Sequence, residues 1–143
     1  MMKTIAIING PNLDVLEKRD SSLYGGNSFD IIKEKLTQEF NDLNIIFFQS
    51  NLEGEICSFI NSKSDEIDGL IINPGAFTHS SIAIRDSLNL LKIPVIEVHL
   101  SNISSREYFR KINLTTSIAK GYISGFKENS YYAACYLLKK ILN

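Results

Sequence analysis

Short apolar runs alternate with segments of helical periodicity along this chain, and this alternation constrains the fold more than any other feature. The runs cover residues 5–8, 45–48, 69–72, 93–96 and 119–124, each of strand length. Residues 29–43, 52–65, 80–91 and 128–142 carry apolar side chains at helical spacing. Strands that alternate with helices form a parallel sheet with helices on both faces. The sequence therefore predicts an α/β fold.

The near-continuous apolar character of these runs indicates strands that are buried on both faces. We therefore predict a doubly wound, five-stranded parallel sheet with a flavodoxin-like strand order. No shift in composition divides the 143 residues, and this length suits one sizeable core. The prediction is a single domain that spans residues 1–143.

Charge and hydropathy exclude several functional classes. The net charge of −1 gives no reason to expect a nucleic acid or an anionic membrane as a partner. No apolar run approaches the roughly 20 residues that span a bilayer. The first residues show no secretion signal, and the two cysteines, Cys57 and Cys135, lack metal spacing. We expect a cytoplasmic protein with reduced cysteines.

The segment after the first strand is long for a strand-to-helix connection, which usually takes about 2–6 residues. It holds Arg19 and Tyr24, five positions apart, and a folded-back loop could bring them together. A guanidinium beside a phenol stabilises the phenolate. The alternative is a surface arginine and a tyrosine that packs on the sheet edge. The phosphate-binding patterns GxxxxGK[ST] and GxGxxG are both missing, so we expect no nucleotide or flavin cofactor.

The fourth strand ends in polar residues. Residues two apart on a strand point to the same face, so Glu97 and His99 should lie side by side, with Ser101 following. A carboxylate beside an imidazole suits a proton donor that works near neutral pH. Arg106 and Arg110, four apart, would share one helix face and could clamp a carboxylate. The alternatives are a strand that turns polar at the surface and an exposed basic helix face.

The third strand is followed by Asn73, whose amide both donates and accepts hydrogen bonds, and by His79 near a helix start. The positive end of the helix dipole favours a neutral imidazole there. The alternative is an Asx-Pro turn followed by a helix cap. A phospho-receiver domain shares this fold but needs carboxylates at the ends of the first and third strands. This chain has Asn9 and Asn73 there, so we do not expect a receiver domain. The two histidines lie on different loops, so we expect no metal site.

Several of these motifs together resemble the type II 3-dehydroquinate dehydratases. The matching segments are residues 8–13 (Ile-Asn-Gly-Pro-Asn-Leu), Arg19 with Tyr24, residues 71–76 (Ile-Ile-Asn-Pro-Gly-Ala) and residues 95–102 (Val-Ile-Glu-Val-His-Leu-Ser-Asn). Their order and separations match the family over nearly the whole chain. The resemblance implies a flavodoxin-like fold, in agreement with the alternation of strands and helices.

The resemblance also implies a catalytic domain and a reaction. A lyase of this family dehydrates 3-dehydroquinate to 3-dehydroshikimate by anti elimination through an enolate, the third step of the shikimate pathway. It uses no metal and no other cofactor. The family assembles as a homododecamer, a tetramer of trimers. The alternative is a catalytically idle flavodoxin-like module that binds a small acid.

Residue roles follow from the same resemblance. Tyr24 would be the base, Arg19 would keep it ionised, and His99, oriented by Glu97, would be the acid. Asn12 would help to hold the enolate oxygen through a water. The expected substrate contacts are Asn73, His79, Leu100, Ser101, Arg106, Arg110 and Asp86. Asp86 would reach the site from a neighbouring subunit.

Overall fold

The five expected strands form one parallel sheet in the computed structural model, which describes residues 1–143 throughout. They are β1 (Lys3–Asn9), β2 (Leu43–Gln49), β3 (Gly69–Asn73), β4 (Val95–His99) and β5 (Gly121–Ser124). Their order across the sheet is β2-β1-β3-β4-β5, and every neighbouring pair is parallel. The predicted flavodoxin-like topology is confirmed.

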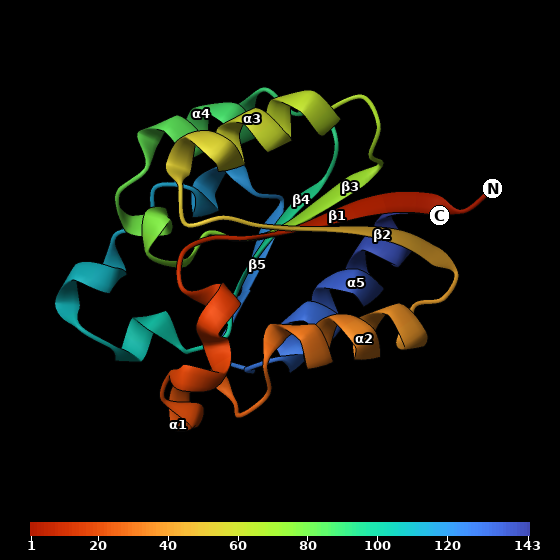
Figure 1. The fold of residues 1–143 in the computed structure, drawn as a ribbon. Helices are drawn as coiled ribbons and strands as arrows, with labels where there is room; N and C mark the ends of the chain where they lie inside the picture. Colours follow the sequence, from red (N-terminus) through yellow and green to blue (C-terminus); the bar gives the residue numbers. More distant parts are fainter.

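Helices cover both faces of the sheet (Figure 1). The longer helices are α2 (Phe29–Glu39), α3 (Glu53–Lys63), α4 (Ile82–Asn89) and α5 (Asn129–Leu142). In Figure 1, α2 and α5 lie below the sheet, and α3 and α4 lie above it. The sheet is therefore the middle one of three layers.

The alternation of side chains along each strand divides the core in two. In β1, Ile5 and Ile7 join a buried cluster with residues of α2 and α5, whereas Ala6 and Ile8 join one with residues of α3 and α4. In β4, Val95 belongs to the second cluster, so Glu97 and His99 continue the row of side chains on the α3 and α4 face.

Several boundaries differ from those expected, three of them as follows. The fourth strand begins at Val95 rather than at residue 93, because Pro94 has no N–H to give to a sheet ladder. The helix expected over residues 29–43 is α2, which stops at Glu39. Leu43 instead begins β2. The fifth strand is shorter than expected and begins at Gly121.

Three of the connections contain short helices whose bounds the sequence pattern did not predict. The connection after β1 holds η1 (Leu13–Lys18) and α1 (Ser21–Tyr24), and η2 (Gly75–His79) follows β3. Between β4 and β5 lie η3 (Ile103–Ser105), η4 (Tyr108–Lys111) and η5 (Thr116–Ile118). The expected single helix that carries both Arg106 and Arg110 is wrong. Arg106 has an extended backbone between η3 and η4, so the two arginines share no helix face.

The carboxyl ends of β1 and β3 are held together closely. Asn9 pairs in register with Asn73, and the backbone N–H of Gly10 donates to the Asn73 carbonyl at 2.7 Å. A Cβ on Gly10 would lie 2.2 Å from the Pro74 carbonyl oxygen, so only glycine fits at this position. This contact fixes the two loops that continue from these strands.

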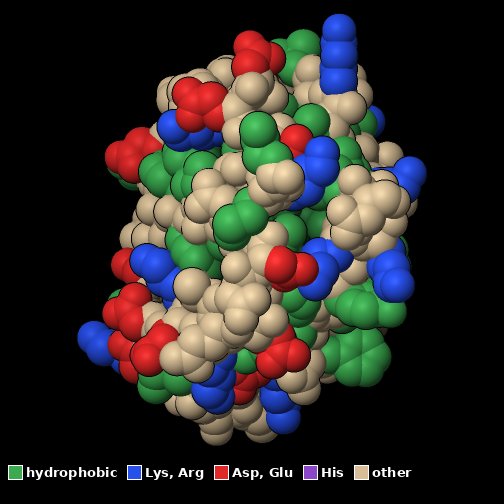
Figure 2. Space-filling model, turned by 90° about the vertical axis from the view of Figure 1, so that its right-hand side faces the viewer, with side chains coloured by type: hydrophobic (Ala, Val, Ile, Leu, Met, Phe, Trp, Pro, Cys, Tyr) green, Lys and Arg blue, Asp and Glu red, His purple; other side chains and the backbone are tan.

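The face of the molecule at the amino ends of the strands carries charged side chains of both signs. Figure 2 shows this face with lysine, arginine and acidic side chains scattered among hydrophobic ones. Charges of both signs are mixed there, in keeping with the net charge of −1.

Candidate active site

A cavity of about 130 Å³ lies at the carboxyl edge of the sheet. The loops after β1, β3 and β4 supply its walls, as expected for an open parallel sheet. Its lining is Pro11, Asn12, Leu13, Arg19, Tyr24, Asn73, Gly75, Ala76, His79, His99, Leu100, Ser101, Ile103, Arg106 and Arg110. This lining contains three arginines and no carboxylate, so the cavity suits an anion.

The Tyr24 hydroxyl lies between two guanidinium groups. Arg19 Nη2 donates to the phenolic oxygen at 2.6 Å, and Arg106 Nη1 donates to it at 2.5 Å. The Arg19 guanidinium also stacks on the Tyr24 ring, 3.8 Å from its centroid. Burial lowers the pKa of Arg19, and the charges of Arg106 and Arg110 act in the same direction, against the attraction of Tyr24. These crowded cations make this wall of the cavity strongly positive.

Local sequence explains how Arg19 and Tyr24 meet. Leu13 and Leu16 are buried and anchor η1, and the backbone N–H of Arg19 donates to the Leu16 carbonyl. Asp20 caps the next short helix by accepting from the Ser22 N–H at 2.9 Å. The chain thus folds back within five residues, and the expected Arg19–Tyr24 pair is confirmed.

The Glu97–His99 pair on β4 is also present. The Glu97 side chain is fully buried, and its Oε2 lies 2.8 Å from His99 Nε2. A carboxylate accepts, so Nε2 carries a proton, and the other nitrogen, Nδ1, makes no hydrogen bond within the chain. Burial alone would raise the pKa of Glu97. Hydrogen bonds from His99, Thr115 and Thr116, with the charge of His99, lower it below the usual value.

Hydrogen bonds fix the orientation of the Asn73 amide and of the His79 ring in the cavity wall. Asn73 accepts from the Gly75 N–H at 3.1 Å and donates to the Tyr131 hydroxyl at 3.0 Å. His79 Nδ1 donates to the Ile112 carbonyl at 2.8 Å, which leaves Nε2 as the acceptor of a neutral ring. Burial lowers the pKa of His79, and the charge of Arg110 adds to this effect.

Hydrogen bonds to neighbouring side chains also hold Arg106 and Arg110 in the cavity wall. Arg106 Nη1 also donates to Ser101 Oγ at 3.1 Å, and Arg110 Nε pairs with Glu107 at 2.8 Å. Asn12 adopts a left-handed backbone conformation with a φ of 68°, which asparagine tolerates better than most residues.

The structure brings the predicted site residues together, with the exception of Asp86. Glu97 lies behind His99 and contacts it, as expected. Asp86 is exposed on α4 and does not line this chain's cavity. Sequence reasoning missed Thr78, Thr115 and Thr116, whose hydroxyls surround Glu97, and Tyr131, which contacts Asn73. Tyr131 showed only as one residue in the buried pattern of the last helix.

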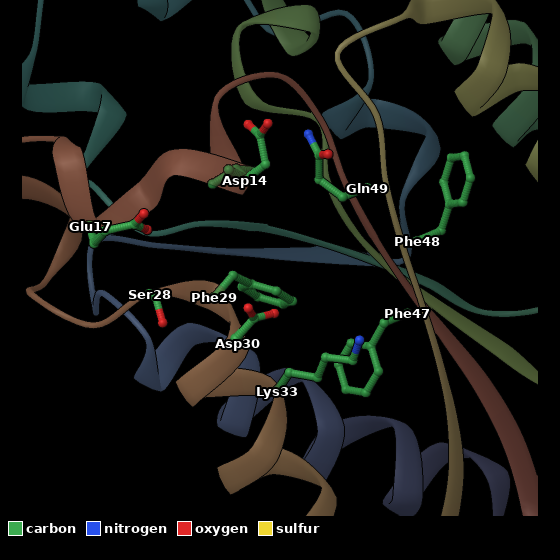
Figure 3. Close-up of a pocket in the computed structure, with 10 residues that line it drawn as sticks. Asp14, Glu17, Ser28, Phe29, Asp30, Lys33, Phe47, Phe48 and Gln49 are labelled. Carbon is green, nitrogen blue, oxygen red and sulfur yellow. The ribbon is translucent and has the colours of Figure 1, made fainter.

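A larger hollow of about 330 Å³ lies between η1, α2 and β2 (Figure 3). Asp14, Glu17 and Asp30 line it, against the single cation of Lys33. Lys33 Nζ lies 5.3 Å from the centroid of the Phe47 ring, on the same wall. This mainly acidic lining repels an anionic ligand, so the smaller, arginine-rich cavity is the better candidate site for an anion.

Two features of the structure bear on metal ions and membranes. None of its His, Cys, Asp and Glu side chains form a group of three or more that could hold a metal ion. None of its helices has the length and apolar character needed to cross a membrane.

Comparison with known proteins places the chain in a family. Residues 3–139 match the family described as dehydroquinase class II. A 3-dehydroquinate dehydratase from Caldicellulosiruptor saccharolyticus is 49% identical over 144 residues and covers 99% of both chains. One from Clostridium perfringens is 48% identical over 139 residues and covers 95% of both chains.

Solved structures agree with the sequence comparisons. The crystal structure of a type II dehydroquinase from Butyrivibrio crossotus matches with a TM-score of 0.93 at 37% identity, covering 96% of this chain and 98% of that one. These relatives favour the enzyme over the idle binding module. The chain belongs to the class II dehydroquinase family.

Proposed function

We propose that this protein dehydrates 3-dehydroquinate to 3-dehydroshikimate by anti elimination through an enolate, the third step of the shikimate pathway. One observation carries the proposal. The Tyr24 oxygen accepts hydrogen bonds from two guanidinium groups in the same cavity that His99 lines, with Glu97 behind it. A stabilised phenolate and a carboxylate-supported imidazole supply the base and the acid that an elimination needs.

Tyr24 is the base in this proposal. Removal of its proton leaves a phenolate that Arg19 and Arg106 stabilise by charge and by hydrogen bonding. The phenolate takes a proton from the carbon next to the ketone, and the electron pair moves onto the ketone oxygen to give an enolate. Asn12, at the cavity wall, helps to hold that oxygen through a water.

His99 is the acid. Its Nε2–H is directed to Glu97, so the acid is the imidazolium form, whose second proton lies on Nδ1 and is delivered to the departing hydroxyl. The enolate collapses as the C–O bond breaks, and water leaves with the proton from Nδ1. This step restores the ketone and forms the new double bond conjugated with it.

The other lining residues bind the substrate. The charge of Arg110, with Leu100 and Ser101, holds the carboxylate, and Arg106 assists at the same side. Asn73 and His79 hold hydroxyl groups in this proposal. Asn73 keeps a second amide proton for this bond, and His79 keeps Nε2 as an acceptor.

The proposal extends to organisation. Residues 1–143 act as one catalytic domain in a homododecamer, a tetramer of trimers, and Asp86 completes the site of a neighbouring subunit. Its exposed position on α4 supports this, as do the exposed apolar side chains of Tyr108, Phe109 and Ile112. We also infer a cytoplasmic location, supported by the free thiols of both cysteines.

A direct assay tests the proposed function. The purified protein is mixed with 3-dehydroquinate, and the absorbance of the conjugated enone product is followed. Turnover that falls by roughly 100-fold or more in His99→Gln is the expected result. Binding of the compound by folded wild-type protein without product would instead favour the idle binding module.

A further inference from the structure

Three threonine hydroxyls surround the buried Glu97 carboxylate. Thr115 Oγ1 donates to Oε1, and Thr116 Oγ1 donates to Oε2, which also receives the His99 Nε2–H. Thr78 Oγ1 lies 3.4 Å from Oε2 and 2.8 Å from Thr115 Oγ1. None of these threonines has a role in the mechanism described above.

The directions of these hydrogen bonds follow from counting protons. A hydroxyl has one proton to donate, and Thr115 gives its own to Glu97. Thr78 therefore donates to Thr115 across the 2.8 Å contact, and this chain strengthens the bond from Thr115 to the carboxylate. Glu97 thus accepts three hydrogen bonds, each of which favours its charged form.

The charges near Glu97 and His99 affect which of the two residues holds the proton between them. The cavity holds Arg19, Arg106 and Arg110, whose positive charges all disfavour a cationic His99. Glu97 is the one carboxylate in contact with His99. Burial disfavours two separated charges, so a buried carboxylate and imidazole can also share their proton as a neutral pair, with the proton on the carboxylate.

We propose that Thr115 and Thr116 are positioning residues that keep the shared proton on His99 rather than on Glu97. His99 is then an imidazolium whose Nδ1–H faces the cavity. Without these donors the proton moves to Glu97 and Nε2 becomes an acceptor. The proton on Nδ1 then belongs to a neutral ring, which is a much weaker acid. The inference rests on the proposed function for its catalytic meaning, although the proton position itself does not require turnover.

Hydrogen bonds to residues of α4 and η2 hold the segment that contains Thr115 and Thr116 in place. Arg85 Nη1 donates to the Leu114 carbonyl at 2.6 Å and to Ser117 Oγ at 2.7 Å. The backbone N–H of Leu114 donates to the Thr78 carbonyl at 2.6 Å. These bonds flank Thr115 and Thr116 on both sides, so the hydroxyls meet Glu97 in a set geometry.

Nitrogen NMR of the imidazole rings tests the proposal directly, because the chain has two histidines in all. Full-length protein with labelled histidine is titrated between pH 5 and 7, and His79→Asn assigns the signals. Thr115→Val and Thr116→Val keep the side-chain shape and remove the donor. Thr115→Ser restores the hydroxyl, and Thr37→Val is the matched control, since Thr37 is exposed on α2 and bonds only to Lys33.

We expect an imidazolium signature for His99 at the low end of this range in wild type, Thr115→Ser and Thr37→Val. In Thr115→Val and Thr116→Val the signature at the same pH changes to a neutral ring with a protonated Nδ1. An unchanged imidazolium signature in the folded valine variants overturns the proposal. Thr116 is only partly buried, so its variant keeps the test valid if Thr115→Val does not fold.

Steady-state kinetics separate this inference from the proposed function. With 3-dehydroquinate, the valine variants should lose roughly 10-fold to 100-fold in kcat at little change in KM, because only proton delivery is affected. Equal losses in the serine and valine variants would contradict a role for the hydroxyl. Absence of turnover in wild type would overturn the proposed function, while the NMR result still decides the position of the proton.

Discussion

Arg106 Nη1 lies 2.5 Å from the phenolic oxygen of Tyr24, although 82 positions separate the two residues. Arg19 Nη2 approaches the same oxygen at 2.6 Å from only five positions away. One neighbour is therefore local and the other depends on the tertiary fold. Together they tie the loop after β1 to the loop after β4 across the cavity.

Removal of one guanidinium should shift the pH dependence of turnover. In Arg19→Ala the Tyr24 oxygen loses one of its two cationic donors, so the limb of the kcat/KM profile that reports the base should move to higher pH. A hydrogen bond to a charged group contributes about 1.5–3 kcal/mol, which corresponds to a shift of roughly one to two pH units. Lys18→Ala, a neighbouring exposed cation of η1, is the control and should leave the profile unchanged. An unmoved limb in Arg19→Ala would exclude this role for Arg19.

His79 should make stability depend on pH. Its pKa in the folded state lies below the usual 6.5, first because of burial and then because of the charge of Arg110. The unfolded chain therefore binds the proton more readily, so the free energy of unfolding should fall as pH decreases from about 7.5 through 6.5 toward the folded-state pKa. His79→Asn retains a donor for the Ile112 carbonyl and should flatten this dependence. Urea denaturation at several pH values measures it, and equal slopes for both proteins would contradict the prediction.

The close contact at Gly10 predicts a strong steric effect. In Gly10→Ala the new Cβ would clash with the Pro74 carbonyl, so we expect a loss of about 2 kcal/mol or more in the free energy of unfolding. Gly54→Ala on α3 is the matched control, because nothing lies within 4 Å of its added Cβ. It should stabilise the helix by up to about 1 kcal/mol. Similar midpoints of urea denaturation for the two variants would show that β1 and β3 are not held as closely as described.

Tyr131 should support the site from below. Its buried hydroxyl donates to Asn9 Oδ1 at 2.6 Å and accepts from Asn73 Nδ2 at 3.0 Å. Tyr131→Phe removes the partner of Asn9 Oδ1 and of Asn73 Nδ2, which should cost about 1–3 kcal/mol. It should also raise KM, because the Gly75 N–H alone then holds the Asn73 amide. Tyr132→Phe is the matched control, as its hydroxyl makes no hydrogen bond in the chain and lies outside the cavity. If both variants behave alike, Tyr131 does not position Asn73.

Much of the fold follows from patterns that act locally. Apolar runs of strand length that alternate with helical periodicity predict the parallel sheet and its strand order, because short connections leave few topologies. The alternation of faces within a strand also places Glu97 beside His99. Ser28 caps α2 by accepting from the Ile31 N–H, as its place before the helical pattern indicates.

The parts that sequence reasoning missed depend on contacts between distant segments. Arg106 was expected on a helix, but bonds to Tyr24 and Ser101 hold it in an extended segment. Thr115 and Thr116 lie in an irregular segment, where no periodicity indicates that they face β4. Hydrogen bonds of this kind leave no pattern along the chain, since each partner is set by the tertiary structure.

The central claim is that Tyr24 is the base of an elimination. The most direct test compares wild type with Tyr24→Phe by enone absorbance and by equilibrium binding of 3-dehydroquinate. Phenylalanine keeps the ring on which Arg19 stacks and removes only the ionisable oxygen. We predict turnover by wild type, and binding without turnover by the variant, with kcat lower by at least roughly 100-fold. A Tyr24→Phe variant that keeps a near-normal kcat would contradict the assignment of Tyr24 as the base.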